Sequence, residues 1–346
     1  HSFPTRRSSD LEPGTGSTKK DIYSINVNDG TKKLVKKDLQ GVIAASYISP
    51  TGKYIMWYDS KAKNYFIYDG DAARNITSKI KVPLYDEEHD LPGEPAPYGV
   101  MGWHEGDSSV YIYDRYDVWK INPTGKSDPF TLTSPTAFGF GRKQKNSFRY
   151  LKTDPDELFL KSGQPLYFRM TNLSNKKTAI VVITAEGLTG YPELITEISD
   201  HWYSVFARAK NNPSFIYTRE SYFNSPDIYF TTKSGIDINT VQGWHVGGLP
   251  FSKLSSINPQ QKEYNWGTAE LYKWKTFKGK PSEGILYKPE DFDPSKKYPL
   301  ILYFYEKLSD GLNIYHPPSP TPSRLNISFF VSRGYLVFAQ IGRAHV

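Results

Sequence analysis

Short segments that alternate apolar and polar residues recur along most of the chain. Five of them have the pattern of two strands joined by a polar turn, and they begin at Asp21, Asn64, Asp117, Pro165 and Asp227. Further strand pairs, joined by turns containing Gly, Asn or Pro, are predicted at residues 44–59, 98–114 and 201–220. No helical periodicity of ten or more residues is evident before residue 320. The pattern therefore predicts a mainly β chain.

The spacing of the five hairpins indicates a repeat. Successive hairpins are separated by steps of 43 to 62 residues, which leaves room for about four short strands in each step. Four-stranded units repeated at this spacing predict a β-propeller, in which radial repetition protects the edges of the sheets. We expect about five blades, an incomplete propeller, over residues 12–262. The alternative is a β-sandwich or two small barrels in which the spacing is accidental.

The pattern changes after Tyr264. Two alternating strands are predicted at residues 269–276 and 282–288, and they are followed by a wholly apolar strand at residues 300–305. A helix at 326–332 and a second apolar strand at 334–339 complete the segment. Apolar strands of this kind suit the interior of an α/β sheet covered on both faces. We therefore expect a second domain to begin at residue 263 and to occupy residues 263–339.

Composition supports this reading and excludes several kinds of chemistry. The 7 Trp, 26 Tyr and 19 Phe residues favour strands. The absence of cysteine excludes disulfides, thiolate metal sites and a cysteine nucleophile. The net charge of +7 comes from scattered lysine pairs interleaved with acids, a pattern typical of a solvated surface rather than of a nucleic-acid interface. Uninterrupted apolar runs stay far below the roughly 18 residues that a membrane span needs, and no compartment is assigned.

The two ends of the chain have a different character. Residues 1–11 and 340–346 can be back-translated into strings that look like sequencing adapters. The bases that spell Arg7 to Leu11 then include the reverse complement of those that spell Gln340 to Ala344. The alternative for the first end is a basic targeting arm, but the apolar region of a signal peptide is missing. We expect residues 12–339, with a net charge of +5, to be a fragment of a longer protein truncated at both ends.

Residues 264–339 resemble the entrance to the α/β-hydrolase domain of the prolyl oligopeptidase family of serine peptidases, in particular its dipeptidyl-peptidase-like branch. The residues that carry the resemblance are the Lys278-Gly279 turn, the stretch GILYKPEDFDPSKKYP at 284–299, the strand LILYFY at 300–305 and ISFFVSRGYLVFA at 327–339. Over the earlier part the likeness is architectural, apart from SPTGKYI at 49–55, which is similar to the SPDGK turn of these propellers and of TolB-like proteins. The resemblance implies a partial β-propeller followed by the truncated N-terminal part of an α/β-hydrolase domain.

The resemblance also implies a function. Members of the family hydrolyse peptide bonds with a Ser-His-Asp triad whose serine lies in a G-x-S-x-G motif, and no metal or other cofactor takes part. This chain contains no G-x-S-x-G. All three triad residues are expected downstream of Ala339, so the fragment is predicted to be inactive, and the partner of the parent protein is a peptide substrate. The alternative is a TolB-like propeller that binds a partner without catalysis.

Tyr305 is the candidate catalytic residue that the resemblance places within this chain. In the family, a tyrosine after the first buried strand donates its hydroxyl to the oxyanion of the tetrahedral intermediate. Glu306 and Lys307 follow Tyr305 where small residues are commoner, so the shape of the loop departs from the pattern. Tyr303 is the competitor if the register slips by two residues. The other interpretation is that Tyr305 is an aromatic residue packing at the end of a strand.

Other polar residues are better explained by structure. The run Asp86-Glu87-Glu88-His89-Asp90 is expected to be a solvated acidic loop rather than a metal site or a binding site for a substrate amino group. His104, His201 and His245 each adjoin a tryptophan and are expected at strand ends, and His316 is expected in a proline-rich loop. The stretch GTGSTKK at 14–20 lacks the spacing of a phosphate-binding loop and is expected to be a linker.

Overall fold

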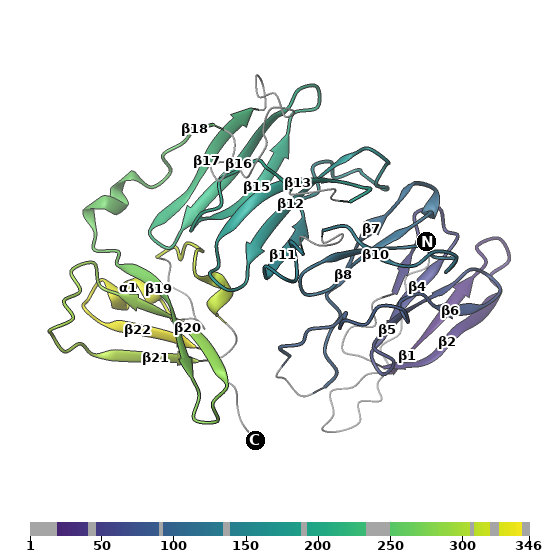
Figure 1. Cartoon of the computed structure of the whole chain (residues 1–346), viewed down its shortest axis with the longest axis horizontal. Coiled ribbons are helices and arrows are strands. Elements are labelled where there is room, and N and C mark those ends of the chain that lie inside the picture. The colour runs from purple at the N-terminus through teal and green to yellow at the C-terminus, as the bar shows by residue number, and fades with distance from the viewer. Residues whose placement is uncertain are drawn as a thin grey trace. The chain divides into compact units, whose positions relative to one another are not determined.

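The computed structural model describes residues 19–40, 46–89, 93–133, 139–187, 192–232, 250–304, 308–318 and 325–340. Strands dominate these residues, which confirms the prediction of a mainly β chain (Figure 1). The chain forms two compact units, each described by itself below. The first contains the described residues up to Leu166 and 183–187, and the second contains 167–182 and the described residues from 192 onward.

The first unit is built from antiparallel sheets of consecutive strands. A two-stranded sheet comes first, and two four-stranded sheets follow in the orders β3-β4-β5-β6 and β10-β9-β8-β7. Their strands are β1 (Lys19–Ile25), β2 (Lys32–Gln40), β3 (Ser46–Ile48), β4 (Ile55–Asp59), β5 (Asn64–Tyr68), β6 (Ala73–Asn75), β7 (Val100–Trp103), β8 (Val110–Tyr113), β9 (Val118–Ile121) and β10 (Phe130–Thr131). Alternate residues such as Met56, Tyr58 and Ile67 enter one core with Trp103 and Val110, as the alternation predicted.

Two more four-stranded antiparallel sheets follow, in the orders β11-β12-β13-β14 and β15-β16-β17-β18. Their strands are β11 (Asn146–Tyr150), β12 (Pro165–Asn172), β13 (Thr178–Thr184), β14 (Glu193–Leu194), β15 (Trp202–Arg208), β16 (Ser214–Ser221), β17 (Asn224–Thr232) and β18 (Phe251–Lys253). The described residues thus contain four consecutive four-stranded antiparallel sheets, the pattern of propeller blades.

Two predicted hairpins differ in detail from the structure. The hairpin that begins at Pro165 supplies the second and third strands of its sheet, whereas the hairpins that begin at Asn64 and Asp117 supply the third and fourth, so the predicted repeats are one strand out of phase. The reason is that β11, in which the polar residues Asn146 and Ser147 are buried, lacks the apolar alternation that predicts a strand. The partner of β17 is β18, and the second strand predicted for the hairpin at Asp227 lies outside the described residues.

In each of these four antiparallel sheets, a hydroxyl group that follows the last strand binds the third strand in the same way. The hydroxyl oxygens of Thr77, Thr133, Thr196 and Ser255 accept hydrogen bonds from backbone N–H groups of the third strand, at Tyr65, Val118, Ile180 and Ile228. In three of the sheets the same hydroxyl donates to the Asn or Asp directly before that N–H group, as Thr133 does to Asp117 at 2.8 Å. This hydroxyl clasp shows that the sheets are structural repeats.

The last sheet is of a different type. Its strands are β19 (Thr268–Lys275), β20 (Pro281–Lys288), β21 (Leu300–Phe304) and β22 (Leu336–Gln340), in the order β19-β20-β22-β21. The pair β21 and β22 is parallel, with Leu300 beside Leu336, and the connection between them contains α1 (Ile327–Val331). Asn326 caps this helix by accepting a hydrogen bond from the N–H of Phe329. These bounds agree with the predicted strands and helix within two residues.

One face of this sheet packs against α1, with Ile285, Tyr287, Val331 and Val337 in the core. The prediction that the strand at 300–305 is buried on both faces is wrong for its described residues. Ile301 and Tyr303 pack on the core, but Leu300, Leu302 and Phe304 are 52%, 54% and 62% exposed. The physical reason is that the crossover through α1 covers one face.

No helix among the described residues is long and apolar enough to cross a bilayer.

Candidate functional site

The predicted catalytic residue Tyr305 lies outside the described residues, together with Glu306 and Lys307. Strand β21 ends at Phe304, which is paired in register with Gln340 at the end of β22. The ends of parallel strands are where α/β sheets place their functional loops. Tyr303, the competitor, shares the face of Ile301 and packs partly buried against the core below α1. The role of Tyr305 stays a prediction.

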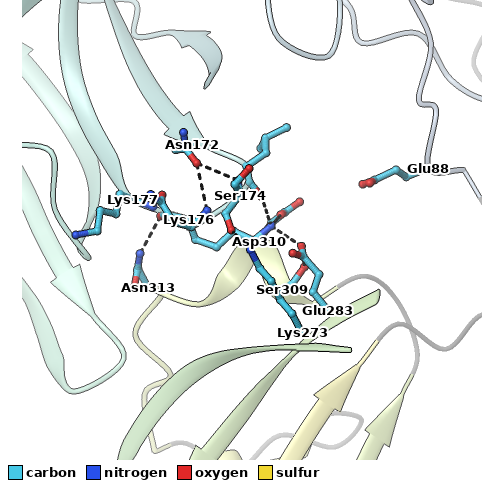
Figure 2. A network of polar contacts seen from close by, with 12 residues as sticks. Glu88, Asn172, Ser174, Lys176, Lys177, Lys273, Glu283, Ser309, Asp310 and Asn313 are labelled. Carbon is cyan, nitrogen blue, oxygen red and sulfur yellow. Dashed lines mark hydrogen bonds and ion pairs between the residues drawn. The ribbon is translucent and has the colours of Figure 1, made fainter. Parts of the chain in front are cut away.

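A polar network lies within the second unit, between the β12–β13 turn and the last sheet (Figure 2). Its centre is Lys176, whose side chain is 1% exposed. The Lys176 Nζ lies 2.6 Å from Oε1 of Glu283 on β20 and 2.9 Å from Oδ1 of Asp310 in the short 3-10 turn η3 (Ser309–Gly311), and it donates to the carbonyl of Leu173 at 2.9 Å. Three acceptors therefore satisfy the three donors of one buried ammonium group.

Further hydrogen bonds hold the same elements together. Ser309 Oγ donates to Glu283 Oε1 at 2.8 Å, and Asn313 Nδ2 donates to the backbone carbonyl of Lys176 at 2.9 Å. From β19, Lys273 donates to the carbonyl of Ser174 at 2.5 Å. The side chain of Lys177 extends away from the network, as Figure 2 shows. The turn after β12 is thus attached to β19, to β20 and to the segment that follows β21.

The network is a structural ion cluster in which one buried cation faces two carboxylates. Lys176 lies fully buried, whereas Glu283 and Asp310 keep 22% and 49% of their side chains exposed. Removing the ammonium would leave both carboxylates with access to water, whereas removing both carboxylates would leave a buried charge unpaired. Lys176 adopts a left-handed backbone conformation with φ of 65°. Sequence reasoning missed it, because a lysine in a polar turn gives no sign of its distant partners.

The segment that links the two kinds of sheet is fixed by aromatic residues. Trp266 Nε1 donates to the carbonyl of Tyr222 at 2.7 Å, and its ring stacks on that of Tyr315, with 5.3 Å between the ring centres. Gly267 follows with φ of 87°, and a Cβ there would collide with the carbonyl oxygen of Lys288 and with Val331. Only glycine fits this close approach. Trp266 and Gly267 therefore fix the chain directly before β19, the first strand of the last sheet.

Part of the acidic run at residues 86–90 is paired with an arginine. Arg115 Nη2 lies 2.5 Å from Glu88 Oε1, and Asp86 accepts a hydrogen bond from the N–H of Glu88. Asp90, the last residue of the run, lies outside the described residues. Over the part of the chain that the structure describes, no three His, Asp or Glu residues are grouped as a metal site requires.

The histidines lie in different parts of the chain and have different surroundings. His104 contacts Ser108 through Nδ1 at 2.9 Å, and the ring of His316 lies against those of Tyr222 and Tyr287. His201 contacts Ser199 and Arg219, and burial followed by the charge of Arg219 lowers the pKa of His201 to about 4. His245 lies outside the described residues. The prediction of His201 at a strand end agrees with its position beside the first residue of β15.

Comparison with known proteins gives structural neighbours. No protein-family model and no curated protein matches the sequence. Among solved structures, dipeptidyl peptidase 4 of Porphyromonas gingivalis matches 93% of this chain with a TM-score of 0.53 and 16% identity. A post-proline cleaving enzyme from Rickettsia typhi matches 92% with a TM-score of 0.50 and 13% identity. A Bacteroides ovatus protein described as a dipeptidyl aminopeptidase IV matches 93% with a TM-score of 0.53 and 12% identity.

The similarity concerns the fold. This chain spans 41%, 43% and 44% of the three matched chains, so it corresponds to less than half of each. At identities of 12 to 16% the match shows a shared architecture and does not carry over an activity. The succession of antiparallel sheets and the final sheet with its parallel pair are therefore an arrangement found in known peptidase structures.

Proposed function

We propose that this chain is part of a serine peptidase that hydrolyses short peptides. The observation that carries the proposal is the last sheet, in which β21, α1 and β22 form a parallel crossover directly after four blade-like sheets. A propeller that only binds a partner has no use for such a crossover. The fold likeness to three peptidase-related structures supports the same conclusion. The proposed domain boundary lies at residues 262 and 263.

The chemistry would be divided between this chain and residues outside it. A serine hydroxyl would attack the scissile carbonyl, a histidine would take its proton, and an aspartate would orient the histidine. The 346 residues contain no G-x-S-x-G motif, so we assign the triad to a segment downstream of Ala339. Tyr305 would donate its hydroxyl to the oxyanion, a contribution worth about 3 kcal/mol in comparable sites.

The test compares the product of the complete coding sequence with the 346-residue chain. The complete protein is expected to hydrolyse a proline-linked or alanine-linked peptide anilide and to be labelled by a fluorophosphonate, whereas the 346-residue chain does neither. In the complete protein, Tyr305→Phe should lower kcat by roughly 100-fold with little change in KM, because the lost bond forms only in the transition state. A complete protein that neither turns over peptides nor takes the label would refute the proposal.

A further inference from the structure

A cavity with a volume of about 260 Å³ lies within the first unit. It is lined by residues of β7, β8 and β11 and of the loop at 151–164 that joins β11 to β12. Most of the lining residues are aromatic or otherwise apolar, among them Met101, Trp103, Tyr113, Tyr150 and Phe159. An apolar cavity of roughly 150 Å³ holds a benzene molecule, so this one has room for an aromatic ring with a short chain attached.

Backbone and hydroxyl hydrogen bonds fix the walls of this cavity. The N–H of Leu160 donates to the carbonyl of Trp103 at 2.8 Å, and the N–H of Glu105 donates to the carbonyl of Leu160 at 2.9 Å, so the end of the loop is bound to the end of β7. The hydroxyl of Tyr113 accepts a hydrogen bond from the N–H of Tyr150 at 3.1 Å. The cavity is therefore preformed, which reduces the entropic cost of binding a ligand.

One carboxylate, that of Glu157, belongs to the lining and is held in a fixed position. Its Oε2 atom accepts a hydrogen bond from the hydroxyl of Tyr150 at 2.7 Å, and its Oε1 atom accepts one from the side-chain amide of Gln164. Burial, followed by the hydrogen bond to Glu157, raises the pKa of Tyr150, so its hydroxyl keeps the proton that it donates. A carboxylate has about four acceptor sites, so two remain for a ligand or solvent.

The charge of Glu157 is not balanced by an ion pair. Among the described residues, no lysine or arginine lies within ion-pairing distance of it. Lys152 also lines the cavity, but its Nζ atom donates to a backbone carbonyl of its own loop at 2.8 Å, and Arg149 lies against the ring of Tyr113 without lining the cavity. Asp154 and Asp156 add two more carboxylates to the loop beside Glu157. The loop thus favours a cation over an anion.

We propose that this cavity binds a small organic cation, whose apolar body lies among the aromatic rings and whose primary ammonium group pairs with Glu157. The ammonium would form a charge-assisted hydrogen bond with the carboxylate, and aromatic rings attract a cation through their π faces. An anion would be repelled by Glu157, and a neutral ligand would gain the apolar contacts alone. The site requires no triad, so it stands independently of the proposed peptidase function.

The test uses three probes that share a benzene ring and a short chain but differ in charge: phenethylammonium, phenethyl alcohol and hydrocinnamate. Each is titrated into the 346-residue chain by calorimetry. The ammonium is expected to bind about tenfold more tightly than the alcohol, because only the ammonium gains the charge-assisted hydrogen bond. Hydrocinnamate is expected to bind most weakly of the three.

Two variants assign this preference to its residue. Glu157→Gln keeps an oxygen that can accept from Tyr150 but removes the charge, so it should bring the ammonium down to the affinity of the alcohol. Lys152→Met is the matched control, because it removes the cation that lines the same cavity. It should keep the preference for the ammonium or increase it, since it takes away a like charge.

Three results would overturn the proposal. The first is equal affinity of the unmodified chain for the ammonium and the alcohol, a comparison that holds even if a variant fails to fold. The second is the absence of measurable binding of the ammonium at about 10 millimolar, roughly ten times a dissociation constant of about 1 millimolar. The third is a folded Glu157→Gln variant that retains the preference, or a folded Lys152→Met variant that loses it.

Discussion

The Nζ atom of Lys176 lies 2.6 Å from Oε1 of Glu283, a residue 107 positions further along the chain. Lys176 belongs to a hairpin turn of an antiparallel sheet, and Glu283 belongs to the sheet that contains the parallel pair. A single buried cation therefore joins the repeat region to the start of the α/β sheet. Because its partners stay partly exposed and can be hydrated, the lysine is the member of the network that can be removed without leaving a buried charge unpaired.

Replacing Lys176 by Met should destabilise the second unit by about 2 kcal/mol. Methionine fills the same space but loses the three hydrogen bonds that the ammonium donates, and the released carboxylates recover part of the cost through hydration. The measurement is the free energy of unfolding in urea, together with amide hydrogen exchange at residues 173–177 and 309–313. Exchange there should accelerate while the sheet of β3 to β6 is unchanged.

The matched control is Lys177→Met at the next position. Lys177 is 41% exposed and its contact with Asp200, at 3.3 Å, is a surface pair, so the expected loss is below about 0.5 kcal/mol. Equal losses in the free energy of unfolding would show that the network around Lys176 contributes no more to stability than a surface ion pair.

The hydroxyl clasp can be tested at Thr133. Thr133→Val keeps the shape of the side chain but removes the buried hydroxyl that accepts from the N–H of Val118 and donates to Asp117. The expected loss in the free energy of unfolding is about 1–2 kcal/mol. Thr131→Val is the control, because Thr131 lies on β10 in the same sheet but outside the clasp. A loss at Thr131 as large as that at Thr133 would argue against the clasp.

His201 predicts how stability depends on pH. Burial and the charge of Arg219 lower its pKa to about 4, below the ordinary value of 6.5, so the unfolded chain binds more protons between these values. The stability due to neutral His201 is therefore complete above pH 6.5 and is lost as the pH falls toward 4. The midpoint of urea unfolding should fall less between pH 7 and pH 5 in His201→Gln than in the unmodified chain.

The independent check on this prediction is an NMR titration of the His201 ring, which gives its pKa directly. A midpoint near 6.5, or a His201→Gln variant with the original pH dependence, would contradict the environment described for this histidine.

The uncovered face of β21 predicts association of the chain. Leu302 is 54% exposed, whereas its neighbour Ile301 packs on the core beneath α1. Leu302→Lys should keep the fold and reduce light scattering, because it places a charge on an apolar strand. Ile301→Lys should instead unfold the last sheet, because it buries that charge. If both variants unfold, or both leave scattering unchanged, the assignment of the two faces is wrong.

Much of this fold follows from the alternation of apolar residues. Met56, Tyr58 and Ile67 occupy the core as the period of two predicts, and the change of pattern after Tyr264 marks the sheet with the parallel pair. Strand β11 lacks this alternation, because two of its buried residues, Asn146 and Ser147, are polar.

The candidate site was less predictable. The partners of Lys176 come from distant parts of the sequence, and no local pattern indicates which turn lysine will be buried. The assignment of Tyr305 depends on the resemblance of the strand before it to a known family, and the role of this residue stays a prediction.

The most direct test of the proposed serine peptidase is the coding sequence beyond Ala339. The account predicts an open frame in which a G-x-S-x-G motif follows after about one further turn and strand, with Asp and then His downstream. A stop codon directly after Ala339, or a continuation without that motif, would contradict it.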